Sequence, residues 1–152
     1  MAPEGIATPF YDGLAALPHF NPDDDVEPLP PTVAALRAEI RSADALLLST
    51  PEYAGALPGS FKNVLDWAVG DGEPRSIYEK RVAWINASSR GAVGAHEELC
   101  TVLGYVKAAV VETARAHIPV TSAMVGDDGL ISDPAIRDQI AAALVELAGQ
   151  DP

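Results

Sequence analysis

The sequence predicts an α/β domain whose mostly parallel sheet is covered by helices on both sides, a doubly wound architecture of three layers. Apolar segments of strand length, at residues 45–49 and 81–86, each run into a loop and then into a segment with helical spacing. This alternation favours parallel pairing, because parallel strands are usually joined by a helix. The length of 152 residues suits one domain, so we expect a single domain over residues 1–152.

The remaining elements follow from the same two periodicities. We expect strands at residues 6–11, 45–49, 81–86, 108–111 and 118–122, the last two separated by an interruption at 114–117. We expect helices at residues 32–42, 59–69 and 95–106, and a closing helix that begins at Pro134 with Asp133 as its N-cap. The run Ala-Leu-Leu-Leu-Ser at 45–49 is continuously apolar, which predicts a central strand buried on both faces.

Composition excludes several classes of function. The formal net charge of −12 would repel nucleic acid phosphates and anionic membrane surfaces, so we expect neither as a partner. No apolar run is long enough to cross a bilayer. The single cysteine, Cys100, provides no internal disulfide and no structural zinc site, and the amino terminus lacks a secretory pattern. We therefore expect a cytoplasmic protein without a metal.

Two loops are the expected ligand-binding segments. Doubly wound sheets bind ligands at the carboxyl ends of their strands. The loops that follow the predicted strands at 45–49 and 81–86 are residues 50–58 and 87–94. Both contain glycine, which lets a backbone approach a ligand closely and leaves its N–H groups free to donate hydrogen bonds.

The first of these loops belongs to a longer motif. Residues 49–67 have the sequence STPEYAGALPGSFKNVLDW. This segment resembles the signature of the NADPH-dependent FMN reductases, in which a buried strand runs into Pro-Glu-Tyr-Asn, Pro-Gly, and a helix with Lys-Asn and Asp-Trp. The resemblance implies a flavodoxin-like fold. It also implies flavin contacts, which fall on Pro51, Glu52, Tyr53, Ala54 and Gly55.

Ala54 departs from the family pattern, which usually has Asn at this position. The departure removes a side-chain amide and with it a hydrogen bond or packing contact. Taken without the resemblance, residues 51–59 are also consistent with an ordinary tight turn, with Glu52 as a solvated acid.

The second loop, Ala-Ser-Ser-Arg-Gly-Ala-Val-Gly at 87–94, resembles the loop that passes the other side of the flavin in that family. Within it we expect Ser88, Arg90, Gly91 and Gly94 to contact the cofactor. Considered alone, this segment could equally be a flexible connection between strand and helix.

One part of the family pattern is missing. Members begin with an apolar strand and a Gly-Ser-Leu-Arg type loop that holds the FMN phosphate, and this sequence begins close to what resembles the second strand, at residues 6–11. In the strand order 2-1-3-4-5, the absent strand would leave a gap beside residues 45–49. A start upstream of Met1, a natural fragment and an element from another chain are the three explanations, and the intact remainder favours the first.

The resemblance implies an NAD(P)H-dependent FMN reductase that uses FMN and NADPH. Hydride would pass from NADPH to FMN and on to a small-molecule acceptor such as a flavin, a quinone, an azo dye or a metal ion. No side chain is needed as a catalytic acid or base. The alternative is a non-catalytic protein of the same fold, either an electron carrier or a truncated remnant without cofactor. The family commonly forms homo-oligomers, so we expect a dimer or tetramer.

Several further residues are assigned structural roles. His19, His96 and His117 lack ligand spacing and are expected to be surface or capping groups. Cys100 is expected in the core. Phe61 and Trp67 lie on the helix after the first loop, and their two alternative places are the core and a subunit contact. The subunit contact is favoured, because the family commonly associates through this region.

Overall fold

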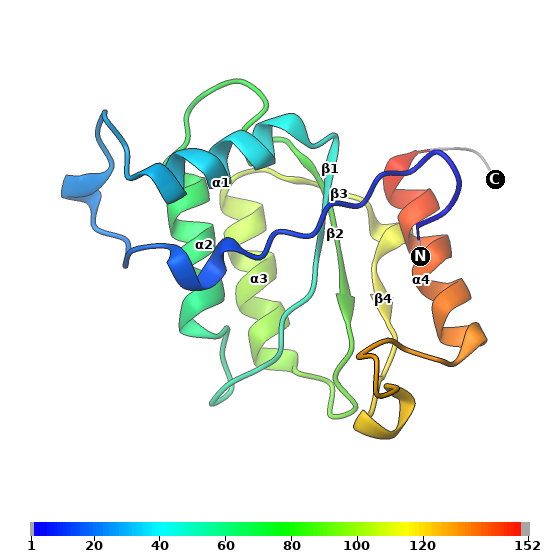
Figure 1. The fold of residues 1–152 in the computed structure, drawn as a ribbon. Coiled ribbons are helices and arrows are strands. Elements are labelled where there is room, and N and C mark those ends of the chain that lie inside the picture. The colour runs from blue at the N-terminus through cyan, green and yellow to red at the C-terminus, as the bar shows by residue number, and fades with distance from the viewer. Residues whose placement is uncertain (1, 150–152) are drawn as a thin grey trace.

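The computed structural model describes residues 2–149, which form a parallel sheet with helices on both faces. Its strands are β1 (Ala45–Leu48), β2 (Arg81–Asn86), β3 (Ala109–Val110) and β4 (Ala116–His117). Its α-helices are α1 (Pro31–Ser42), α2 (Gly59–Val69), α3 (Val93–Tyr105) and α4 (Pro134–Ala148). Figure 1 shows α1, α2 and α3 on one side of the strands and α4 on the other. The predicted three-layer architecture is confirmed.

Strand β2 is the centre of the sheet. It pairs in parallel with β1 along one side, where Ala45 lies opposite Arg81. Along its other side it pairs first with β3 and then with β4, where Ile85 lies opposite Ala116. A short 3-10 helix, Glu112–Ala114, separates β3 from β4. The two short strands therefore lie in succession along the same side of β2.

Three strand predictions are wrong in position. Residues 6–11 form no strand in the structure. Strand β1 is not central, because within residues 2–149 it pairs only with β2, and Leu47 is 36% exposed. The last strand is formed by Ala116 and His117, not by residues 118–122. The physical reason is common to the first two: a strand needs a neighbour, and no described strand occupies the far side of β1.

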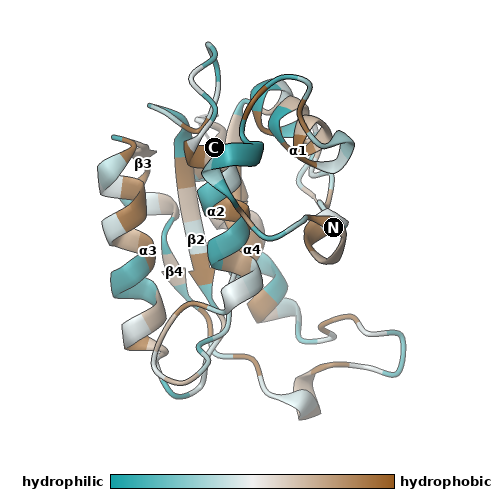
Figure 2. Ribbon diagram, turned by 90° about the vertical axis from the view of Figure 1, so that its left-hand side faces the viewer, coloured by the Kyte–Doolittle hydropathy of each residue, from teal (hydrophilic) through white to brown (hydrophobic). Residues whose placement is uncertain are grey.

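The two faces of β2 belong to different cores. Val82 and Trp84 pack with the core of α1, α2 and α3, whereas Ala83 and Ile85 pack toward α4. This alternation is the two-residue period of a strand covered on both sides. In Figure 2 the helix α3 changes repeatedly between hydrophobic and hydrophilic segments, as expected of a helix with one buried face.

That periodicity corrects the prediction for Cys100. On α3 the buried residues include Leu99 and Leu103, which share one face of the helix. Cys100 is one position further along than Leu99, so it turns out of the core and is exposed as a free thiol. The prediction that Cys100 is a core residue is therefore wrong.

Helix α4 begins as the sequence predicts. Pro134 is its first residue, and Oδ1 of Asp133 accepts hydrogen bonds from the backbone N–H groups of Ala135 (2.8 Å) and Ile136 (3.4 Å). These bonds satisfy amides that have no partner inside the helix. No helix within residues 2–149, α4 included, has the length and apolar character needed to cross a membrane.

The proline-rich loop before α1 is held by the helix that carries the Lys-Asn and Asp-Trp pairs. Asn63 Oδ1 accepts from the Phe20 N–H (2.7 Å), and Asn63 Nδ2 donates to the Pro18 carbonyl (2.9 Å). Trp67 Nε1 donates to the same carbonyl (2.9 Å), and its ring meets Phe20 edge to face at 4.9 Å. Trp67 is fully buried in the core, so of its two predicted places it takes the core and not the favoured subunit contact.

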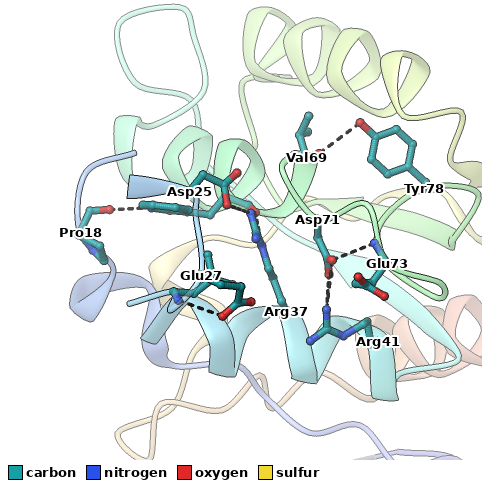
Figure 3. A network of polar contacts seen from close by, with 11 residues as sticks. Pro18, Asp25, Glu27, Arg37, Arg41, Val69, Asp71, Glu73 and Tyr78 are labelled. Atoms are coloured by element: carbon teal, nitrogen blue, oxygen red, sulfur yellow. Dashed lines mark hydrogen bonds and ion pairs between the residues drawn. The ribbon is translucent and has the colours of Figure 1, made fainter. Parts of the chain in front are cut away.

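A buried guanidinium joins the same loop to α1 and α2. Arg37 is 5% exposed, and its Nη2 lies 2.7 Å from Oδ1 of Asp25. Its Nε and Nη2 also donate to the carbonyl of Trp67, at 3.0 Å and 2.8 Å. Figure 3 shows this network beside the pair formed by Arg41 and Asp71. The buried charge is thus paired and hydrogen-bonded, as burial requires.

Replacing Asn63 with alanine tests the loop attachment. The variant leaves the Phe20 N–H and one bond to the Pro18 carbonyl unmade, so we expect the free energy of unfolding to fall by about 1–3 kcal/mol in urea denaturation. Lys62→Ala is the control, because its pair with Asp66 is a surface pair worth about 0.5 kcal/mol or less. Equal stability of the two variants would contradict the attachment.

Candidate functional site

The two loops predicted from the sequence lie at one edge of the sheet. The first loop is residues 50–58, before α2, and the second loop is residues 87–94, of which the last two are also the first two residues of α3. Because β1 and β2 are parallel neighbours, their carboxyl ends lie together and the two loops start side by side. This is the edge at which sheets of this kind bind ligands.

The first loop is a tight turn with an exposed tip. Tyr53 and Ala56 exchange two backbone hydrogen bonds, of 3.0 Å and 3.1 Å. Between them, Ala54 and Gly55 have positive φ angles of 53° and 79°, as in the type I′ turns that favour Asn-Gly. Within residues 2–149, the N–H groups of Glu52, Ala54 and Gly55 donate to no acceptor. The turn therefore offers unpaired backbone donors.

The second loop is shaped by the last residue of β2. Asn86 Nδ2 donates to the Gly91 carbonyl (2.6 Å), and its Oδ1 accepts from the Ser88 N–H (3.0 Å). Oγ of Ser88 accepts from the Arg90 N–H (3.1 Å), and Nε2 of His117 lies 2.8 Å from the Ser88 carbonyl. Ser88 is thus committed to the internal structure of the loop.

The first loop also contacts the start of α3. Oε2 of Glu52 accepts from the Ala95 N–H (3.1 Å), and Oε2 of Glu98 accepts from the Leu57 N–H (2.7 Å). At Gly94 there is no room for a side chain, since a Cβ there would lie 2.0 Å from the Gly55 carbonyl oxygen. Gly94 therefore permits a close approach between the two loops.

An open depression of about 410 Å³ lies beside the second loop. It is lined in part by Asn86, His96, Arg115 and His117, and the Arg115 guanidinium lies 3.9 Å from the ring centre of Trp84. Nδ1 of His96 is 2.7 Å from the Ala92 carbonyl and must carry the proton that it donates, which leaves Nε2 buried and without a partner among the described residues. A larger depression, of about 480 Å³, lies at residues 72–79, at the opposite end of β2.

All nine residues predicted to contact a cofactor lie in or directly beside these two loops. Pro51, Tyr53, Ala54, Gly55 and Arg90 are exposed, and Tyr53 keeps 65% of its surface accessible. Glu52, Ser88, Gly91 and Gly94 are half-buried. The exposed donors and the flat ring of Tyr53 fit the polar edge and the face of a planar heterocycle such as isoalloxazine.

The family model of the NADPH-dependent FMN reductases matches residues 1–121, most of the chain. The chain belongs to this family. The flavodoxin-like fold that the resemblance implies is confirmed by a solved member of the same fold, the flavoenzyme NAD(P)H:(acceptor) oxidoreductase FerB from Paracoccus denitrificans. The two superimpose with a TM-score of 0.73 at 27% identity, over 90% of this chain and 78% of that one.

Curated relatives agree with the family assignment. An NAD(P)H-dependent FMN reductase of Pseudomonas aeruginosa is 35% identical over 62% of this chain and 49% of its own length. A probable NADPH:quinone oxidoreductase of Oryza sativa is 30% identical over 86% of this chain and 66% of its own length. A 2-hydroxy-1,4-benzoquinone reductase of a Burkholderia species is 30% identical over 86% of this chain and 72% of its own. The chain thus spans about half of the length of the first relative and about two thirds of the length of the second.

Sequence reasoning missed two residues that shape the site of this FMN reductase family member. Asn86 could have been found, because a polar residue at the end of a predicted buried strand points to the edge where ligands bind. Glu98 gives no such signal, since an exposed acid on a helix is ordinary and its partner Leu57 lies 41 positions away.

The turn at Ala54 provides a first test of the site. A left-handed conformation costs an alanine roughly 1 kcal/mol, and asparagine tolerates it better. Ala54→Asn should therefore raise the free energy of unfolding by up to about 1 kcal/mol, while Ala54→Val should lower it by about as much or more. Urea denaturation of both variants measures this, and the reverse order would contradict the turn.

Gly94 provides a second test. Gly94→Ala forces the Gly55 carbonyl away, so we expect a loss of about 1–3 kcal/mol in stability. At Gly104, on the same helix, a Cβ would meet no atom within 4 Å, and Gly104→Ala should stabilise α3 by up to about 1 kcal/mol. Thermal unfolding of the pair measures the difference. Equal shifts for both variants would show that the loops are not in contact.

Proposed function

We propose that this chain is an NAD(P)H-dependent oxidoreductase that binds FMN between its two loops and passes electrons to a small acceptor. The observation that carries the proposal is the pair of touching loops at the carboxyl edge of the sheet, with unpaired backbone donors at the exposed turn. Family membership and the names of the relatives support it. When bound, the flavin would supply the hydride and electron-transfer chemistry.

The first loop is suited to the ring of the cofactor. The two carbonyl oxygens and the N1 and N5 nitrogens of an oxidised isoalloxazine accept hydrogen bonds, and the N–H groups of Glu52, Ala54 and Gly55 are free to donate them. Tyr53 adds an exposed aromatic face, and Pro51 restricts the backbone at the entry to the turn. In this proposal the cofactor contacts are Pro51, Glu52, Tyr53, Ala54 and Gly55.

The second loop would cover the other side of the flavin ring. Gly91 has no side chain, so a flat ring can approach its main chain closely, while its N–H and carbonyl bond to Ser88 and Asn86 inside the loop. Arg90 beside it is an exposed cation. Ser88 and Gly94 contribute by holding the loop in shape. No side chain here is assigned as a catalytic acid or base, because hydride transfer needs only that donor and ring be stacked and that water be excluded.

A quinone is the acceptor to test first. Relatives of this chain are named as quinone reductases, from Burkholderia and other organisms. The proposal extends to a homo-oligomer and a cytoplasmic location. NADPH and an exposed unpaired thiol at Cys100 both suit a reducing compartment.

The test is a titration of the 152-residue chain with FMN and, separately, with riboflavin, followed by quenching of flavin fluorescence. We expect saturable binding of both, with dissociation constants within about tenfold of each other, or about 1.4 kcal/mol. In this proposal the donors bind the ring that both flavins share, and the net charge of −12 does not favour the phosphate of FMN. NADPH oxidation in the presence of a quinone follows as the activity assay.

The outcomes separate three possibilities. Flavin binding with quinone-dependent NADPH oxidation supports the reductase. Flavin binding without NADPH oxidation, but with reduction by an added reductase, would instead indicate an electron carrier. No flavin binding at millimolar FMN would overturn the proposal for this chain.

A further inference from the structure

Two carboxylates cross between the first loop and α3 in opposite directions. Glu52 belongs to the loop and accepts from the Ala95 N–H on the helix, whereas Glu98 belongs to the helix and accepts from the Leu57 N–H in the loop. We infer that Glu52 and Glu98 are positioning residues, which hold the first loop against α3 as one unit and so set the geometry of the flavin-binding backbone. The flavin part of this inference rests on the proposed function.

The pair restrains both ends of the exposed turn. Glu52 precedes the Tyr53–Ala56 turn and Leu57 follows it, so the two crossing bonds hold the residues on either side of the unpaired donors at Ala54 and Gly55. A turn fixed at one end could pivot about that end. A turn fixed at both ends keeps its donors in place relative to α3.

A steric contact adds a third restraint. The Gly55 carbonyl lies so close to Gly94 that not even a methyl group fits between them. The carboxylates draw the loop toward α3, and this contact stops it. The position of the turn is therefore defined from both sides, by attraction and by repulsion.

This arrangement also assigns the Glu52 side chain. Its Oε2 is engaged by the Ala95 N–H, at the amino end of α3, where the helix has amides without internal partners and favours a negative charge. Glu52 thus contributes its backbone N–H to the ligand side and its carboxylate to the helix side.

The restraints differ in expected strength. Glu52 is half-buried, and Glu98 is exposed, so water competes more effectively for the bond of Glu98. Loss of the Glu52 carboxylate should therefore have the larger effect. Hydrogen bonds to a charged group commonly change an equilibrium by tenfold or more, which sets the scale of the expected effect.

The experiment compares Glu52→Ala, Glu52→Gln, Glu98→Ala and Glu98→Gln by amide hydrogen exchange and by FMN titration. Glu52→Ala should speed exchange at Ala95 about tenfold and, through the coupling, also speed it at Leu57. Glu98→Ala should speed exchange at Leu57 and, through the coupling, at Ala95, both to a smaller extent. FMN affinity should fall about tenfold in Glu52→Ala. The glutamine variants, whose side-chain oxygen accepts the same bond, should restore both readouts.

Glu97→Ala is the matched control. Glu97 is the exposed neighbour of Glu98 on α3, and its carboxylate has no polar partner in the described part of the chain. Its loss should leave exchange at Ala95 and Leu57, and FMN affinity, unchanged. An effect equal to that of Glu98→Ala would mean that charge alone matters, and would overturn the inference.

The readouts keep the two proposals distinct. Faster exchange at only the directly bonded amide in each alanine variant would show two independent bonds and overturn the coupling. Coupled exchange with unchanged FMN affinity would overturn the positioning role and leave the reductase proposal intact. If the wild-type chain binds no FMN, the proposed function fails, and reciprocal exchange alone still decides whether the first loop and α3 form one unit.

Discussion

The arrangement of the candidate site depends on the parallel pairing of β2. β1, β3 and β4 all pair with this strand and all run in its direction. Parallel pairing sends the carboxyl ends of the strands to one edge, so the first loop, the second loop and His117 meet there although they are far apart in sequence. Alternate side chains of β2 also supply both cores, which fixes the strand's register against the helices on either face.

The family motif combines residues that shape the fold with residues that face solvent. Asn63 and Trp67 hold the proline-rich loop by hydrogen bonds to Phe20 and Pro18. Glu52 bonds the first loop to α3, and Gly94 lets the two approach closely. Tyr53 and the turn after it are exposed and free of internal bonds at several amides. A single continuous motif can therefore be recognised by its sequence, although only part of it is exposed at the candidate site.

The sequence predicts those elements whose signal is local. β2 and α2 begin and end where predicted, because an apolar run bounded by polar residues, and a helix bounded by Pro-Gly and Gly, carry their limits in their own residues. The position of β1 in the sheet is different, since the same apolar run suits a central or an edge strand and only the neighbours decide. To place Cys100 correctly, the buried face of α3 must be known to within one residue. The bond from Leu57 to Glu98 joins segments that no local sequence pattern relates.

The candidate site presents mainly backbone groups, and this shapes how substitutions act on it. The free donors of the first loop are main-chain amides, and the surrounding side chains of Glu52, Asn86, Ser88 and Glu98 hold the main chain in place. A side chain that only supports the backbone can be exchanged for another that keeps the same shape. Ala54 illustrates the point: its backbone adopts the left-handed turn that the family's Asn would favour, so the loop keeps its form at a cost in stability rather than in shape.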